Sequence, residues 1–295
     1  MAVSVERFIH DNPALFKATA GFVALFRNLQ DPVVAVTRLC KTTDEKVGWV
    51  LLGTALFQNC SYVEFAALMR ALHEKFPEDA LWKLPVPKEV DINGCIESVF
   101  NTRSWPLYEH AAGIFWSVGA FMRNHGAGQN DGKGLATYIA SRTPEELWRD
   151  LGEIYFMGKS NPRPKACAAI YRLSTEVPTG LGIHCRDSQK QAPLPLTMGA
   201  RRYISILGPA SSENSRQGFA ELEPREKQTL ANQLYVALGK EGGFTPYLSS
   251  HGLQYFLENG KEGFICRQVT DHCKKCPLYE FCNYSENRQP DPKQR

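Results

Sequence analysis

Four cysteines near the end of the printed sequence have the spacing of ligands that share one inorganic centre. They follow the pattern C-x6-C-x2-C-x5-C and are Cys266, Cys273, Cys276 and Cys282. Zinc sites made of four cysteines usually contain two C-x2-C pairs separated by a long loop, and here only Cys273 and Cys276 form such a pair. The spacing therefore favours a [4Fe-4S] cluster, which is held by four thiolates. Zinc and a pair of disulfides are the alternatives.

The composition is that of an ordinary globular protein with reduced cysteines. Its 295 residues, 43% of them hydrophobic, can bury one large core or two smaller ones. The N-terminus has no pattern typical of a secretory signal, and the remaining cysteines follow no pattern, which disfavours disulfides. No apolar run approaches the roughly 20 residues that a membrane span needs. We therefore expect an intracellular protein.

Basic residues are concentrated in one segment, although the net charge of the whole chain is only +3. Between Lys159 and Arg202 eight residues are basic and two are acidic. A segment of this charge attracts the phosphates of nucleic acids, and a solvated basic face without a ligand is the alternative. The charge alone does not distinguish a nucleic-acid-binding segment from a solvated basic face.

Helical periodicity and capping patterns predict an all-α fold. The pattern Ser/Thr-x-x-Glu, which caps a helix N-terminus, begins at Thr42, Ser61 and Thr143. The first of these opens an almost wholly apolar stretch that ends at Phe57, which predicts a buried central helix. No stretch alternates well enough to predict a strand. Further helices are expected within residues 1–40, with a break at Asp31, and over 61–76, 108–123 and 165–173, and polar surface insertions over 180–192 and 211–226.

The cysteine spacing and this order of helices resemble the helix-hairpin-helix DNA glycosylase superfamily, which includes endonuclease III and the adenine glycosylases. The resemblance covers about residues 44–284. It implies a helical barrel domain with a hairpin-like element over 44–173, and an iron–sulfur cluster domain formed by 1–43 plus 174–284. Residues 285–295 have the composition of a disordered tail. The resemblance also implies that the four cysteines hold a [4Fe-4S] cluster with a structural role.

The resemblance assigns DNA contacts to several parts of the chain. Gln58 matches the family's glutamine that enters the duplex and fills the space left by an extruded base, and capping of a helix end is the alternative. At the family's hairpin, Asn161-Pro162-Arg163 replaces a Gly-x-Gly sequence, so side chains would substitute for backbone amides at a phosphate. The residues implied to contact DNA are Gln58, Lys159, Asn161, Arg163, Arg201, Arg202, Arg267, Lys274 and Lys275.

Lys165 falls where the strand-cleaving members of the family place a nucleophilic lysine. A neutral amine there can attack the anomeric carbon of the sugar and form a Schiff base, and the cations Lys159 and Arg163 would lower its pKa. A lysine that contacts phosphate is the alternative. Thr197 occupies the position of the family's essential aspartate and cannot replace its charge, so Asp187 is the nearby carboxylate that would substitute.

Two functions from different classes follow from these residues. The first is a monomeric DNA N-glycosylase that binds double-stranded DNA, flips a damaged or modified base and cleaves its glycosidic bond, with a Schiff-base lyase step through Lys165. The second is a non-catalytic binder of distorted or damaged DNA, which Thr197 favours. A redox or interaction module that carries the cluster is a third. The first two predict a cytoplasmic or nucleoid-associated location.

Overall fold

The chain is all-helical wherever a computed structural model describes it. The described residues are 3–26, 31–58, 60–100, 105–158, 163–175, 180–183, 194, 196–254 and 276–282. They form α-helices and 3-10 helices and no strand, so the predicted all-α class is confirmed. Among these residues, no helix is both long enough and apolar enough to cross a membrane.

Residue contacts divide the chain into two compact units. They are residues 30–192, and residues 1–29 together with 193–295. The predicted division placed 1–43 with the cysteine-rich end, whereas the described residues 31–43 group with the helices that follow them. Packing explains the difference, because the helix that begins at Pro32 contacts the next two α-helices. Asp31 also forms an ion pair with Arg172 of the same unit.

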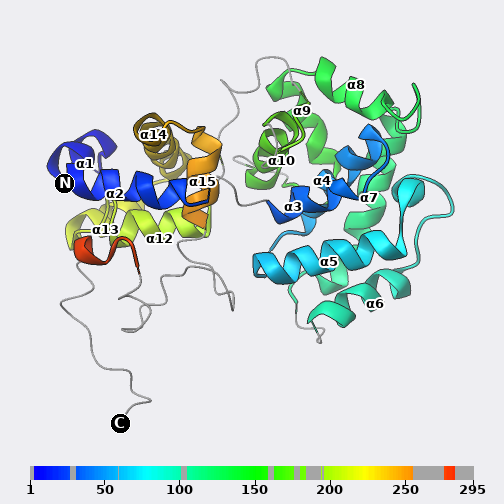
Figure 1. The fold of residues 1–295 in the computed structure, drawn as a ribbon, viewed down its shortest axis with the longest axis horizontal. Coiled ribbons are helices and arrows are strands. Elements are labelled where there is room, and N and C mark those ends of the chain that lie inside the picture. The colour runs from blue at the N-terminus through cyan, green and yellow to red at the C-terminus, as the bar shows by residue number, and fades with distance from the viewer. Residues whose placement is uncertain are drawn as a thin grey trace, which may run out of the picture. The chain divides into compact units, whose positions relative to one another are not determined.

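The unit of residues 30–192 is a set of helices around α4 (Figure 1). Its α-helices are α3 (Pro32–Ala35), α4 (Thr43–Leu56), α5 (Tyr62–Lys75), α6 (Glu89–Phe100), α7 (Ala111–Asn124), α8 (Gly134–Ser141), α9 (Pro144–Asp150) and α10 (Pro164–Ser174). Its 3-10 helices are η1 (Val36–Arg38), η2 (Glu78–Leu81), η3 (Tyr108–His110) and η4 (Leu151–Glu153).

The second unit is built around α14, which packs against α2 and α15. Its elements are α1 (Val5–Asp11), α2 (Pro13–Ala24), α12 (Met198–Ile206), α13 (Glu213–Glu221), α14 (Pro224–Gly242), α15 (Pro246–Gln254) and η6 (Tyr279–Phe281). A hydrogen bond of 2.7 Å between the hydroxyls of Thr19 and Tyr203 joins α2 to α12. A Cβ atom added to Gly199 would lie 2.0 Å from the carbonyl oxygen of Leu253, so glycine permits the close approach of α12 and α15.

Helix α4 is buried on all sides, as the sequence predicts. Every residue from Val47 to Leu56 is buried, and the helix packs against α3, α7, α8 and α10. A Cβ atom at Gly48 would lie 2.4 Å from the methyl carbon of Met122, so a larger residue there would require the Met122 side chain to move. The predicted central helix is confirmed, and it fixes the segment that leads to Gln58.

Two of the three predicted capping boxes are complete. Those that begin at Ser61 and Thr143 have both reciprocal hydrogen bonds. At the start of α4 the Thr42 hydroxyl accepts from the Glu45 amide, but the Glu45 carboxylate accepts from the amide of Lys41 instead of that of Thr42. The carboxylate therefore reaches one residue further back than a capping box requires.

The sequence missed some helices and mispredicted one insertion. Residues 211–226 were expected to be a surface insertion, but they contain α13, which buries Phe219. Helix α6 was missed because Ile92 and Ile96 are the only fully buried residues on it. Of the insertion expected over 180–192, the described residues 180–183 bond to α10, with the amides of Leu181 and Ile183 donating to its carbonyls.

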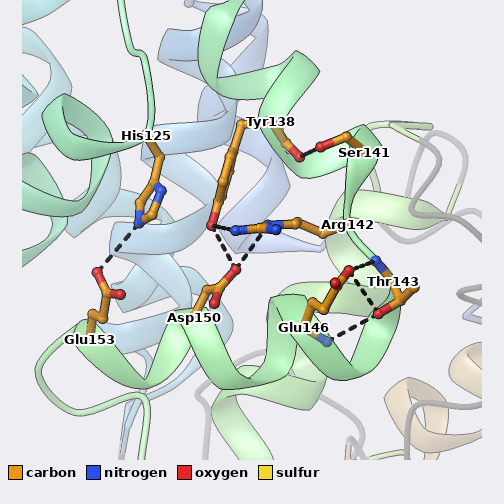
Figure 2. Close-up of polar contacts among 8 residues, drawn as sticks. All are labelled: His125, Tyr138, Ser141, Arg142, Thr143, Glu146, Asp150 and Glu153. Atoms are coloured by element: carbon orange, nitrogen blue, oxygen red, sulfur yellow. Dashed lines mark hydrogen bonds and ion pairs between the residues drawn. The ribbon is translucent and has the colours of Figure 1, made fainter.

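A polar network joins α8 to α9 and so fixes the chain before the hairpin-like region (Figure 2). The Tyr138 hydroxyl donates to Asp150 at 2.6 Å and accepts from Arg142 at 3.0 Å, and Arg142 pairs with Asp150 at 3.1 Å. The ring of His125 stacks on Tyr138 and reaches Glu153. Burial raises the pKa of Tyr138 to about 12, so its hydroxyl stays protonated and remains a donor.

Candidate active site around Lys165

Lys165 lies in the first turn of α10 and points toward the end of α4. Its ammonium nitrogen donates to the carbonyl oxygen of Ala55 at 2.5 Å and to the side-chain oxygen of Gln58 at 3.2 Å. The structure thus brings together the predicted nucleophile and the predicted wedge residue. A second reading of the same contacts is a cation that caps the free carbonyls at the C-terminus of α4.

The environment of Lys165 makes its amine a weaker base than an ordinary lysine. Its pKa is lowered to about 8, mainly by burial; Cys60 raises the pKa, and the charge of Arg172 lowers it. At pH 7 about a tenth of the amine is therefore neutral and able to act as a nucleophile. The sequence predicted Lys159 and Arg163 as the cations that lower this pKa. Lys159 lies outside the described residues, and the described cation that lowers the pKa is Arg172.

Arg163, predicted to contact DNA, directs its side chain into its own unit. The guanidinium lies 4.1 Å from the centre of the Trp148 ring and donates to the Trp148 carbonyl oxygen at 3.0 Å. Gly152 provides the space, because a Cβ atom there would lie 2.6 Å from the guanidinium. A guanidinium engaged in these contacts has fewer N–H groups left for a DNA phosphate. Arg163 therefore joins the start of α10 to Trp148 in the structure.

The segment that precedes α10 contains strained backbone and exposed aromatic side chains. Phe156 and Arg163 have positive φ values of 68° and 42°, which residues other than glycine rarely adopt. Strain of this kind is often concentrated at functional sites. The Phe156 ring centre lies 5.6 Å from the Lys165 nitrogen, and the half-exposed Tyr155 packs edge-on against Phe156. Sequence reasoning missed this aromatic pair, whose signal was two adjacent aromatics just before Gly158.

A buried ion pair adjoins the lysine on the same helix. Arg172 donates to Asp31 at 2.7 Å and to the Thr54 hydroxyl at 3.3 Å. Arg172 is 5% exposed and Asp31 is fully buried. Because each charge is desolvated, each depends on the other for compensation. The pair joins α10 to the start of α3 and to α4, the same helix that ends beside Lys165.

Thr197, in the other unit, is the N-cap of α12. Its hydroxyl accepts from the Ala200 amide at 3.1 Å, so the position has the geometry of a helix cap without a negative charge. Arg201 on the same helix is exposed and Arg202 is partly exposed, as DNA contacts would need to be. The missing carboxylate weakens any mechanism that relies on a charge at this position.

Two of the four predicted cluster ligands are described. Cys276 and Cys282 are partly exposed and stand on either side of η6, and no disulfide joins the described cysteines. The Leu278 amide donates to the Cys276 sulfur at 3.4 Å, a bond that stabilises a thiolate ligand. These two residues therefore fit the proposed cluster.

The remaining predicted site residues lie outside the described part of the chain. They are Lys159, Asn161, Asp187, Cys266, Arg267, Cys273, Lys274 and Lys275. Comparison with protein-family models, with curated proteins and with solved structures found no match to this chain.

Proposed function

We propose that this chain binds duplex DNA, extrudes a damaged or modified base and cleaves its N-glycosidic bond with Lys165 as the nucleophile. The observation that carries the proposal is the lowered pKa of Lys165 together with its hydrogen bond to Gln58. A glutamine that fills the vacated place in the duplex and an amine that attacks the sugar have to act at adjacent positions. In this chain the Lys165 nitrogen lies 3.2 Å from the side-chain oxygen of Gln58.

The chemistry follows from an amine that is partly neutral near pH 7. The nitrogen of Lys165 attacks the anomeric carbon, the bond from that carbon to the base breaks, and the base leaves with the electron pair and takes up a proton. The amine loses a proton, the sugar ring opens and an imine joins Lys165 to the sugar. Once the amine is neutral, an N–H bond can remain on the carbonyl of Ala55 and orient the nitrogen while its lone pair attacks.

A [4Fe-4S] cluster held by Cys266, Cys273, Cys276 and Cys282 would fasten the C-terminal segment and take no part in the reaction. Four thiolates leave no open coordination position for a substrate. Its metal bonds would add stability to the segment that carries the four cysteines. The cluster is thus proposed as a structural support for a DNA-binding surface.

A non-catalytic binder of distorted DNA is the second candidate, and Thr197 is the observation that favours it. Its hydroxyl caps α12 and carries no charge, whereas loss of a group that stabilises transition-state charge commonly costs about a hundredfold or more in rate. Both candidates share Gln58 and the basic residues. They differ in whether Lys165 ever forms a covalent bond.

Reduction with borohydride during incubation with DNA separates the two candidates. An imine between Lys165 and an opened sugar would be reduced to a stable amine, which leaves a protein–DNA adduct of increased mass. The substrates are duplexes that contain an abasic site, an oxidised pyrimidine, a mismatched adenine or an alkylated purine. Tight binding without an adduct or base release on any of them would favour the binder.

Replacement of Arg201 by alanine should weaken duplex binding and reduce its dependence on salt. An exposed arginine that contacts a phosphate releases about one counterion, so the slope of log affinity against log salt should fall by about one. Fluorescence anisotropy at several salt concentrations measures the slope. Arg225→Ala, at an exposed position on α14, is the control. Equal slopes in both variants would place the DNA surface elsewhere.

The purified protein should be brown and contain about four iron and four sulfide ions per chain. Cys276→Ser should remove the colour and most of the iron, because an alcohol is a poor ligand for the cluster. Cys95→Ser, at a partly buried thiol on α6, should retain both. Zinc in place of iron after anaerobic purification would contradict the cluster.

A further inference from the structure

Three side chains of metal-ligand type meet where α4 begins. Cys40 precedes the helix, Glu45 lies in its first turn, and His73 comes from the last turn of α5. One ligand atom from each, a sulfur, an oxygen and a nitrogen, lies within 4.8 Å of the other two. This group belongs to the unit of residues 30–192 and shares no residue with the proposed cluster. The proposed function leaves it unexplained.

The group is buried, which distinguishes it from acidic clusters on protein surfaces. Glu45 is 1% exposed, His73 is 8% exposed and Cys40 is 9% exposed. Burial of a carboxylate is costly unless it is compensated. The neighbouring Asp44 is fully compensated, because its two oxygens accept from the amides of Gly128 and Ala136. Glu45 has one such amide, that of Lys41, and its other oxygen faces His73.

Neighbouring groups hold the side chains of Glu45 and His73 in place. The Lys41 amide holds one oxygen of Glu45 at 2.7 Å, which leaves the other oxygen for a cation. The His73 ring packs against Trp49 at 5.1 Å between ring centres, and its Nε2 atom points at that other oxygen. The Cys40 sulfur lies 3.7 Å from the Val36 carbonyl oxygen, and the thiol also hydrogen-bonds to the Glu45 side chain.

We propose that Cys40, Glu45 and His73 bind Zn²⁺, with water as the fourth ligand. Zinc accepts this mixture of sulfur, oxygen and nitrogen donors at about 2.0 to 2.3 Å, which separates tetrahedral ligand atoms by about 3.2 to 3.6 Å. The His73 nitrogen and the Glu45 oxygen are already 3.1 Å apart. The Cys40 sulfur lies within 4.8 Å of both atoms, so it has to approach them by roughly 1–2 Å at most to reach these separations. Binding releases the thiol proton to solvent and leaves a thiolate on the metal.

The site would fasten the residues before α4 to the end of α5, since its ligands come from both. Without metal, the same residues form a buried His73–Glu45 hydrogen bond beside a thiol, which is the competing interpretation. Zinc would replace that hydrogen bond, and the one between the Cys40 thiol and Glu45, with three bonds to the metal. The two interpretations differ in metal content and in the effect of losing the Cys40 sulfur.

Metal analysis of the full chain and of matched cysteine variants tests the site. Wild type purified with Zn²⁺ should hold about one more zinc per chain than Cys40→Ser, at equal iron content. Cys95→Ser should match wild type, because the Cys95 sulfur contacts the Ala71 carbonyl and belongs to no group of metal ligands within the described part of the chain. Equal zinc in all three proteins would overturn the proposal and leave the hydrogen-bonded pair.

X-ray absorption at the zinc edge of the wild-type protein tests the site without any substitution. The expected first shell has about one sulfur and about three nitrogen or oxygen neighbours. A shell of sulfur alone would place the zinc on the C-terminal cysteines, and absence of bound zinc would exclude it from both places. Either result would refute the site even if Cys40→Ser fails to fold.

Discussion

Lys165→Met should abolish the covalent adduct that borohydride traps between the wild-type protein and a lesion-containing duplex. Methionine keeps most of the volume and the apolar stem of lysine but has no amine to form an imine. Loss should therefore be complete, and not a partial decrease. Duplex binding should persist, because Gln58 and the exposed Arg201 remain. Gel separation of the adduct from free protein, with binding measured in parallel, gives both results.

The rate of adduct formation should also follow the protonation of Lys165. Below a pKa of about 8 the neutral fraction rises about tenfold per pH unit, so the rate should rise with it and level off above that pKa. An ordinary surface lysine would continue to gain reactivity to much higher pH. Single-turnover trapping over a series of pH values measures the profile.

Lys75→Met is the control for these experiments. Lys75 lies in the same unit, is about half exposed and pairs with Asp91, so its loss should change neither the adduct nor the pH profile. Persistence of the adduct in Lys165→Met would assign the nucleophile to another amine. A profile that rises without levelling would show that the lysine is not desolvated when DNA is bound.

Local patterns in the sequence predicted most of the unit around α4. The capping residues Ser61 and Thr143 and the apolar run of α4 each encode a helix within a few residues of the chain, so no tertiary information was required. Helix α6 was missed because its apolar stripe is short. Helix α13 was missed because polar residues dominate it and tertiary packing of Phe219 stabilises it.

The candidate site was predictable residue by residue but not in its contacts. The resemblance named Gln58 and Lys165, which are far apart in the sequence, and gave no information on the hydrogen bond between them. The Arg163 side chain packs against the Trp148 ring and fits there because Gly152 has no side chain. Only the folded chain brings these three residues together. The proposed metal ligands Cys40 and His73 were missed for the same reason, because only the folded chain brings them together.

Asp31→Ala should lower the free energy of unfolding of the unit of residues 30–192 by about 3–5 kcal/mol. The substitution leaves the guanidinium of Arg172 buried without a compensating charge, and breaking one side of a buried ion pair costs about that much. All the tryptophans of the chain lie in this unit, so tryptophan fluorescence during urea denaturation reports on it specifically. Asp91→Ala removes an exposed pair with Lys75 in the same unit and should change the same quantity far less, because an exposed ion pair contributes little to stability.

The same pair links stability to the reactivity of Lys165. Asp31→Ala combined with Arg172→Met should recover much of the lost stability, because two apolar side chains need no compensation. The double variant also removes the positive charge that lowers the Lys165 pKa, so the levelling point of its trapping profile should move to higher pH. Lys165 remains desolvated by burial, the larger cause, and the shift should therefore be smaller than a full return to an ordinary lysine. A double variant as unstable as Asp31→Ala would mean that the carboxylate acts mainly as the N-cap of α3, where it accepts from the Val33 amide at 2.9 Å.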